Sequence, residues 1–419
     1  MRLLLVNYRY FVSGGPERYL FNITKELESS GNSVIPFSVR NKHNQSSPFD
    51  RYFLSPLGKG DEIYYEDLER SFCTSLKLID RAGYSLEASV KMRKLIQSEA
   101  PDAAYLLHFL RWISPSIIPV MKASGIPIIV RVSDYSYVCP EAHLLRDGRI
   151  CQLCLGGNLL HSVKYRCIHG SAALSIANML SLYSYRAMKV WSDVDLFVCP
   201  SKFLLTKMAQ GGFPRSKLLH IPTFVDSSRF LPNPVPGEYI LYFGRVAPEK
   251  GLDTLLKAFD LMKSGNAFPA LRLLIVGRCR PADLKKFRAS LGPRAAAYVT
   301  FEPDKGLDEL SALIRDSLCT VVPSRSYENL PNSVLESFAC AKPVVATNIG
   351  SLPEVVQHGE TGLLFEPNSA DDLAHQLSTL ASDALLAERL GKNARNRAEE
   401  YYSPAKHLGS LLQAFRSLR

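Results

Sequence analysis

The chain alternates short apolar runs with longer segments in which apolar residues recur every three or four positions. Leu3–Val6 is the first such run, and Leu20, Ile23 and Leu27 then fall on one face of a predicted helix that ends at Ser29. Buried strands that alternate with amphipathic helices are typical of parallel sheets covered on both faces. The pattern therefore predicts an α/β fold.

The same alternation continues along the chain. Further strands are predicted at Val34–Val39, Ala103–Leu107, Pro127–Val132, Leu196–Cys199, Tyr239–Phe243, Leu271–Val276, Thr320–Val322 and Pro343–Ala346. Helices are predicted at Leu86–Glu99, Ala172–Trp191, Leu252–Met262 and Pro404–Leu418.

The pattern occurs twice, and a Pro- and Gly-rich segment at 232–237 separates the two halves as a linker. A chain of 419 residues exceeds one ordinary core, so two domains are expected. They are predicted at 1–231 and 238–400, followed by a C-terminal helix at 401–419. Two doubly wound sheets that face each other would place their strand-end loops at one central cleft.

Composition and charge limit the cellular location and the classes of binding partner that we expect. No apolar run is long enough to span a membrane and the N-terminus lacks the features of a signal peptide, so we expect a cytoplasmic chain. Residues 1–236 hold 28 Lys/Arg and 19 Asp/Glu, a net charge of +9, whereas residues 237–419 hold 22 and 21, a net charge of +1. The positive charge of the first half favours binding to an anionic membrane surface or a phosphorylated lipid. Alternatively, this basic surface only aids solubility. Nucleic acid is not expected, because no motif of a nucleic-acid module occurs.

The second half holds paired charges beside predicted strand ends. Arg245 and Lys250 follow Gly244 after a strand, where cations and a helix N-terminus suit a diphosphate. Glu328 lies in a later loop, and Asn332 is expected to cap a helix that carries Glu336 in its opening turns. Carboxylates suit the paired hydroxyls of a ribose or hexose. The stretch from Gly350 to Phe365 is expected to be structural.

Together these motifs resemble glycosyltransferase family 4, whose members adopt the GT-B fold. Glu328 and Glu336 match the family's E-x7-E motif, and Gly244, Arg245, Lys250 and Gly251 match its G-R-x4-K-G pattern. The resemblance implies a retaining, metal-independent transfer of a hexose from a UDP- or GDP-linked donor. It also implies that the C-terminal helix crosses back to the first domain.

The resemblance also implies roles for individual residues. Arg245, Lys250 and Glu328 would be catalytic, with the two cations on the diphosphate and Glu328 on the transferred sugar. Glu336 would hold the ribose. The remaining donor-binding residues would lie at glycine turns and at a helix N-terminus: Gly14, Gly15, Gly244, Gly277, Asn329, Leu330, Pro331 and Asn332.

The acceptor is expected in the first domain and to be lipid-linked or a polysaccharide intermediate. Family members often carry a His-Asp pair after the strand at Pro127–Val132, where this chain has Ser133 and Asp134. His108, at the end of an earlier strand, could supply an imidazole there, or it could simply be a packed residue.

Four cysteines form a loop at 139–167 with the spacing C-x11-C-x2-C-x12-C: Cys139, Cys151, Cys154 and Cys167. Four thiolates can close a tetrahedral structural zinc site, and the alternative is a set of reduced thiols that bind no metal. A subset of family 4 has a similar cysteine-bearing loop.

Other functions would require features that the sequence lacks. A glycoside phosphorylase would need a pyridoxal-binding lysine, for which the sequence offers no candidate. A non-catalytic two-lobed protein that binds a sugar or nucleotide remains the alternative, although such proteins are usually exported and the sequence shows no export signal. Against a non-catalytic scaffold that merely kept the fold, the matching Arg245, Lys250, Glu328 and Glu336 are evidence.

Overall fold

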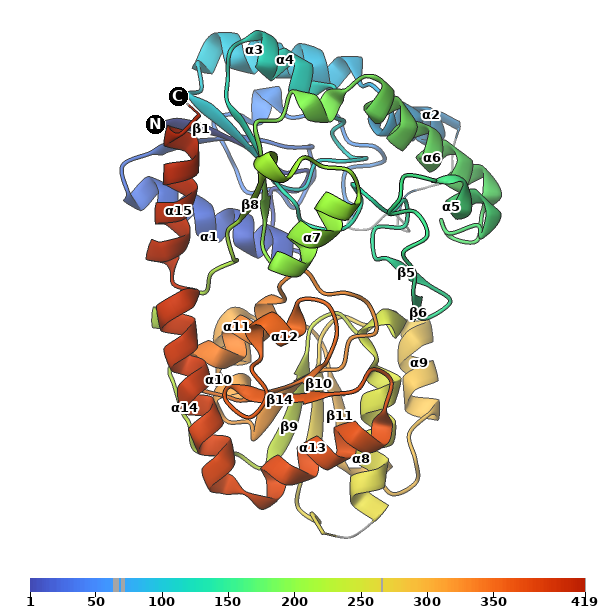
Figure 1. Ribbon diagram of the computed structural model, residues 1–419, viewed down its shortest axis with the longest axis vertical. Coiled ribbons are helices and arrows are strands. Elements are labelled where there is room, and N and C mark those ends of the chain that lie inside the picture. The colour runs from blue at the N-terminus through green and yellow to red at the C-terminus, as the bar shows by residue number, and fades with distance from the viewer. Residues whose placement is uncertain (63–67, 69–71, 265–266, 419) are drawn as a thin grey trace. The chain divides into compact units, whose positions relative to one another are not determined.

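The computed structural model describes residues 1–62, 68, 72–264 and 267–418, and the chain forms two compact units (Figure 1). The first unit comprises residues 1–143, 152–221 and the chain from Leu408 on. The second comprises residues 144–151 and 222–407.

A six-stranded parallel sheet forms the core of the first unit, in the order β2-β1-β3-β4-β7-β8. Its strands are β1 (Arg2–Val6), β2 (Ser33–Phe37), β3 (Ala103–Leu106), β4 (Ile128–Arg131), β7 (Leu196–Cys199) and β8 (Leu218–His220). The chain order reverses between β1 and β3. In such sheets ligands bind at the carboxyl ends of the two strands that flank the reversal.

Helices connect these strands. They are α1 (Gly15–Ser29), α2 (Phe72–Ala82), α3 (Leu86–Glu99), α4 (Ile117–Ala123), α5 (Leu160–Lys164), α6 (Ala172–Ala187) and α7 (Lys202–Gln210). The last helix, α15 (Pro404–Arg416), joins the first unit from Leu408 on, and the ring of Phe415 meets that of Tyr105 on β3 edge to face. The predicted return of the C-terminal helix is thus seen within the first unit.

The second unit has another six-stranded parallel sheet, in the order β11-β10-β9-β12-β13-β14. Its strands are β9 (Tyr239–Phe243), β10 (Arg272–Val276), β11 (Val299–Glu302), β12 (Cys319–Val322), β13 (Val344–Thr347) and β14 (Gly362–Phe365). In chain order this is the Rossmann arrangement, in which the direction of winding reverses between the first and fourth strands, here β9 and β12.

Helices cover both faces of this sheet: α8 (Leu252–Ser264), α9 (Pro281–Ala289), α10 (Leu307–Arg315), α11 (Asn332–Ala339), α12 (Leu352–Val355), α13 (Ala370–Ser382) and α14 (Ala384–Tyr401). Because side chains alternate along a strand, Ile240 and Tyr242 pack into the core under α8 and α13, and Leu241 and Phe243 into the core under α11 and α14. Figure 1 shows α8 and α13 side by side.

The main segment of the second unit, residues 222–407, begins and ends at one place. The carbonyl oxygen of Pro222 lies 2.7 Å from Nδ1 of His407, and the rings of Phe224 and His407 lie 4.8 Å apart. The observed boundary at Pro222 precedes the predicted linker at 232–237. It does so because Val225 and Phe230 belong to the core of the second unit.

Two small elements lie outside the main sheets. β5 (Leu145–Arg146) and β6 (Arg149–Ile150) form a hairpin in the middle of the predicted cysteine loop. Within the described residues, none of the helices is long and apolar enough to cross a membrane.

Candidate active site

Glycines shape the turn that follows β9. Gly244 and Gly277 both have positive φ angles, 132° and 149°. A Cβ atom on Gly277 would lie 1.8 Å from the carbonyl oxygen of Gly244, so the ends of β9 and β10 approach too closely for any other residue. Both predicted donor-site glycines therefore have a backbone role.

Gly251 brings the same turn against the end of β12. It has a φ of +69°, and an added Cβ would lie 1.9 Å from the carbonyl oxygen of Pro323. The turn carrying Lys250 is thereby held against the loop carrying Ser324 and Glu328. These segments flank the point where the sheet reverses its winding.

Lys250 and Glu328 form an ion pair there, with 2.7 Å between Nζ and Oε1. The hydroxyl of Ser324 donates a hydrogen bond to the same carboxylate oxygen. Burial of the carboxylate raises the pKa of Glu328, but the charge of Lys250, the two hydrogen bonds and the charge of Arg245 together hold that pKa below its usual range. The carboxylate is therefore ionised at neutral pH.

Arg245 is the more exposed of the two predicted cations. Its guanidinium pairs with Glu249, four residues further on, and about half of the side chain remains exposed. The backbone is fixed nearby, since the Tyr242 hydroxyl donates to the Arg245 carbonyl at 2.7 Å. Arg245, Lys250 and Glu328 thus lie together, as expected from the sequence.

The loop carrying Glu328 is braced from β13. The Ser351 hydroxyl donates to the carbonyl of Glu328 at 2.8 Å, and Gly350 lies against Tyr327 with a φ of +62°. The stretch from Gly350, expected to be structural, therefore positions the carboxylate.

The helix after this loop begins one residue earlier than predicted. α11 starts at Asn332, and its N-cap is Pro331 rather than Asn332. Proline has no side chain able to accept a hydrogen bond, and its fixed φ suits the entry to a helix. The positive end of the α11 dipole still lies next to the loop.

The other predicted donor residues lie along this loop and helix. Asn329 follows Glu328, Leu330 is buried in the core beneath α11, and Glu336 is buried in the second turn, 6% exposed. Burial of a carboxylate is costly unless polar groups or a ligand accompany it.

In the first unit, His108 and Asp134 lie together at the ends of β3 and β4. Nε2 of His108 is 3.5 Å from Oδ2 of Asp134, and Nδ1 is buried with no hydrogen-bond partner in the described chain. Burial raises the pKa of Asp134, but the charge of His108 and hydrogen bonds from Ser136 lower it below the usual value. The predicted juxtaposition of these two side chains is observed. Ser133 instead donates to the Leu107 carbonyl at 3.3 Å.

Aromatic rings hold His108 in place. The ring of Tyr8, which follows β1, meets His108 edge to face at 4.9 Å. On its other side Tyr8 stacks on Trp112, also at 4.9 Å. These residues flank the β1–β3 reversal of the first sheet, where a ligand site is expected.

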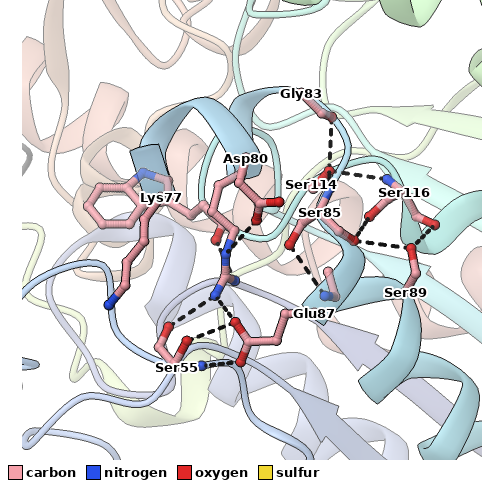
Figure 2. Close-up of polar contacts among 12 residues, drawn as sticks. Ser55, Lys77, Asp80, Gly83, Ser85, Glu87, Ser89, Ser114 and Ser116 are labelled. Atoms are coloured by element: carbon pink, nitrogen blue, oxygen red, sulfur yellow. Dashed lines mark hydrogen bonds and ion pairs between the residues drawn. The ribbon is translucent and has the colours of Figure 1, made fainter. Parts of the chain in front are cut away.

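A buried polar network supports the segment after Trp112. Arg81 is 2% exposed, and its guanidinium donates to the Trp112 carbonyl at 3.3 Å and pairs with Glu87 at 2.6 Å. Figure 2 shows Glu87 and Ser55 turned toward each other, with their oxygens 2.8 Å apart. Nearby, Ser114 accepts a hydrogen bond from the backbone of Ser85. Nothing in the sequence pattern indicated this network.

Gly14 and Gly15 form the start of α1. Gly14 is the N-cap in an extended conformation, so its φ does not require glycine. Glu17, in the first turn, is 1% exposed and accepts a hydrogen bond from Ser13.

A groove of about 630 Å³ lies beside the residues that follow β2. Most of its lining residues carry polar or charged side chains, including Asn41, Gln45 and Ser46. Four are cations, Arg40, Lys42, Arg51 and Lys59, and one is a carboxylate, Asp50. Part of the positive charge is compensated, because Arg51 pairs with Glu99 and Lys42 with Asp61.

The structure provides no ligand set for the predicted zinc. None of Cys139, Cys151, Cys154 and Cys167 forms a disulfide. Across the described ranges, no three His, Cys, Asp or Glu side chains lie where they could hold a metal ion. The Cys151 N–H bonds to the Leu144 carbonyl beside the β5–β6 hairpin, and the Cys167 N–H bonds to the Ser162 carbonyl. The zinc site stays a prediction.

Several residues of the donor region were not assigned roles from the sequence. They are Ser324, which bonds to Glu328; Glu249, which pairs with Arg245; and Arg325, which pairs with Asp253 on α8. The position of Ser324 directly after a predicted strand was the one available signal.

Comparison with protein families gives a match in the second half of the chain. Residues 226–397 match the family described as Glycosyl transferases group 1. D-inositol 3-phosphate glycosyltransferase of Rhodococcus opacus is 36% identical over 173 residues, 40% of this chain and 38% of the relative. An uncharacterized glycosyltransferase of Methanocaldococcus jannaschii is 26% identical over 56% of this chain and 63% of the relative. The chain thus matches less than two thirds of the length of either relative.

Solved structures show the same fold over the whole chain. Sucrose-phosphate synthase from Thermosynechococcus elongatus matches with a TM-score of 0.70 and 20% identity, covering 100% of this chain and 98% of that one. Anabaena HepE in complex with UDP and glucose matches with a TM-score of 0.66 and 16% identity, covering 100% of both chains. The prediction of a GT-B fold with two Rossmann-like domains is confirmed. The family 4 subgroup remains a prediction.

Proposed function

Since residues 226–397 match the group 1 glycosyl transferases, we propose that this chain is a retaining glycosyltransferase that takes a hexose from a UDP- or GDP-linked donor. The observation that carries the proposal is the cluster of Arg245, Lys250 and Glu328 where the second sheet reverses its winding. Nucleotide ligands bind at this point in sheets of this topology.

The cluster has the charges that a departing diphosphate requires. Arg245 and Lys250 supply two fixed cations, and the N-terminus of α11 adds the positive end of a helix dipole. Preorganised charges of this kind stabilise a leaving group without reorganisation during the reaction. The proposed transfer therefore needs no metal cofactor.

The carboxylates suit the hydroxyl-bearing parts of the donor. Glu328 is ionised and next to the cations, where it can accept hydrogen bonds from the transferred sugar. Glu336 lies further along α11, where it can accept hydrogen bonds from the ribose. Without donor, Lys250 pairs with Glu328, so both side chains are already in position.

The proposed step breaks the bond between the anomeric carbon and the diphosphate oxygen. An acceptor hydroxyl attacks the same face of the sugar, and its proton passes to an oxygen of the departing diphosphate. The configuration at the anomeric carbon is then retained. The products are the glycosylated acceptor and the nucleoside diphosphate.

The acceptor side of the reaction is assigned to the first unit. His108 and Asp134 lie at its strand ends, and Asp134 is ionised, so the pair can orient an imidazole toward a sugar. We propose a lipid-linked or polysaccharide acceptor at the inner face of the cell membrane, because the first half carries a net charge of +9. No nucleic acid partner is proposed.

The names of similar proteins support the donor class. HepE has been solved with UDP-glucose, and the relative in Rhodococcus opacus is named as a glycosyltransferase acting with D-inositol 3-phosphate. A UDP-linked hexose is therefore the first donor to test.

Thermal unfolding in the presence of nucleotides tests the proposal. UDP, GDP and UDP-glucose should be compared, because a ligand that binds only the folded chain raises its melting temperature. UDP or GDP should raise the melting temperature, and the shift should be lost in Lys250→Ala. Release of nucleoside diphosphate from the sugar donor would then separate an enzyme from a two-lobed binding protein. Absence of any shift with the unmodified chain would contradict the proposed donor site.

A further inference from the structure

Helix α6 divides into two faces. Its inward face carries Ser175, Met179, Leu182 and Tyr185, which are all buried. The Tyr185 hydroxyl bonds to the carbonyl of Ala82 at the end of α2. One side of α6 is therefore fixed to the body of the first unit.

The opposite face is apolar and exposed. Ile176 and Leu180 are 42% and 58% exposed, and Ala173, Ala177 and Ala187 continue the same stripe at helical spacing. In the first turn of α5, Leu160 is 59% exposed. We call Leu160, Ile176 and Leu180, with these three alanines, the α6 apolar face. Figure 1 shows α5 and α6 packed next to each other.

The serine hydroxyls beside this apolar stripe form hydrogen bonds with backbone carbonyls of the same helix. The hydroxyl of Ser181 donates to the Ala177 carbonyl at 3.0 Å, and that of Ser184 to the Ser181 carbonyl at 2.7 Å. Hydroxyls bonded in this way lose little when they leave water. The helix can therefore enter an apolar environment along this side.

The charge along the segment that forms this face has one sign. No Asp or Glu occurs from residue 148 to residue 192. Lys164 and Arg166 are exposed just before α6, and Lys189 is exposed just after it. A stripe of apolar side chains flanked by cations and free of carboxylates is complementary to an anionic lipid surface.

We propose that the α6 apolar face docks the first unit on an anionic lipid bilayer. Ile176 and Leu180 enter the boundary between headgroups and acyl chains, and Lys164, Arg166 and Lys189 meet lipid phosphates. The inference extends the proposed function, on which it rests for the membrane-bound acceptor, by assigning the surface that reaches the membrane. Neither unit needs to change its fold for this contact.

Vesicle sedimentation tests the assignment. Binding of the full chain should be measured to phosphatidylcholine vesicles with and without phosphatidylglycerol, at low and high salt. We expect stronger binding to the anionic vesicles, weakened by salt. The double variant Ile176→Ser/Leu180→Ser should lower the partition coefficient at least about tenfold, because two large apolar side chains no longer leave water.

A matched control separates apolar docking from general hydrophobicity. Leu385 on α14 is 79% exposed and lies in the second unit, so Leu385→Ser should bind vesicles like the unmodified chain. The triple variant Lys164→Gln/Arg166→Gln/Lys189→Gln should lose the preference for anionic lipid. Equal binding by all these chains would overturn the inference, as would a dimer that dissociates in Ile176→Ser/Leu180→Ser.

The melting temperature and its shift with UDP or GDP should be measured for every variant. An unchanged shift shows that the chain is folded and that the donor site is intact. Loss of vesicle binding in the double variant with this shift retained supports the assignment. If the unmodified chain shows the nucleotide shift but fails to bind vesicles, the docking face is refuted and the proposed donor site stands. If it binds vesicles but no nucleotide, the proposed function fails instead.

Discussion

The ion pair between Lys250 and Glu328 joins residues that are 78 positions apart in the chain. The sequence motifs predicted that each would lie at a strand end near the donor. They could not predict that the two pair with each other, because the pairing depends on which strands are neighbours in the sheet. The adjacency of β9 and β12 supplies that information.

Removal of either cation should slow transfer. Arg245→Ala and Lys250→Ala are each expected to lower turnover by about 100-fold, the usual effect of losing one preorganised group that stabilises developing charge. Lys257→Ala removes an exposed cation from α8 and should leave turnover unchanged. Steady-state rates of nucleoside diphosphate release measure the effect, and normal turnover in Lys250→Ala would exclude that residue from the mechanism.

The burial of Lys342 makes the free energy of unfolding depend on pH. It is fully buried, its Nζ donates to the Val235 carbonyl at 2.6 Å, and burial lowers its pKa from 10.5 to about 8. Between these values the unfolded chain binds a proton that the folded chain does not. The contribution of Lys342 to the free energy of unfolding therefore increases as pH rises from about 8 to 10.5.

Comparison with Lys342→Met isolates the effect. The unfolding free energy of the unmodified chain, relative to this variant, should increase by up to about 3 kcal/mol across the window. Denaturant unfolding at several pH values measures it. Lys257→Met, at an exposed position, should follow the unmodified chain, and a Lys342→Met profile parallel to the unmodified one would contradict the assignment.

At the scale of elements, sequence periodicity predicted the strands well where they are buried on both faces. Tyr239–Phe243 and Leu196–Cys199 have the predicted bounds, and α3 also matches its predicted range. β8 and β11 were not predicted. β8 has only three residues, and β11 is partly exposed, so neither forms a distinct apolar run.

The cysteine loop shows a different limit. Spacing along the chain predicted a zinc site, but a site also requires that the four side chains converge. The β5–β6 hairpin folds the chain back between Cys139 and Cys151, yet among the described residues no three metal-ligating side chains converge. Convergence of side chains cannot be read from cysteine positions alone.

The turn at Gly251 gives an element-scale prediction. Gly251→Ala should destabilise the second unit by about 2 kcal/mol or more, because the new methyl group would collide with the Pro323 carbonyl. It should also weaken nucleotide binding, since the collision separates the segments that carry Lys250 and Glu328.

Gly359→Ala is the matched control for this substitution. Gly359 also has a positive φ, +77°, but no atom lies near an added Cβ. The Gly359→Ala variant therefore measures the loss of stability that a positive φ causes in alanine, without a steric collision. Equal losses of stability and nucleotide binding in the two variants would show that the contact with Pro323 is unimportant.

At the scale of the whole molecule, the two-domain organisation and the sites after β9 and β12 could be predicted from sequence pattern. The boundary near residue 222 could not, because Val225 and Phe230 fall in the predicted first domain at 1–231, and only their burial assigns them to the core of the second unit. The buried network around Arg81 could not be predicted from the sequence either, because the residues that form it come from separate segments of the chain.

The contact between Pro222 and His407 makes residues 222–407, the main segment of the second unit, a closed module inserted into the chain of the first. Its two ends already touch, so cutting the chain at this neck leaves little entropy to be lost in bringing them together. A polypeptide of residues 222–407 should therefore fold alone, unfold in one cooperative transition and retain the nucleotide-induced shift in melting temperature. Aggregation or the absence of a transition would show that the stability of this segment depends on contacts with the rest of the chain.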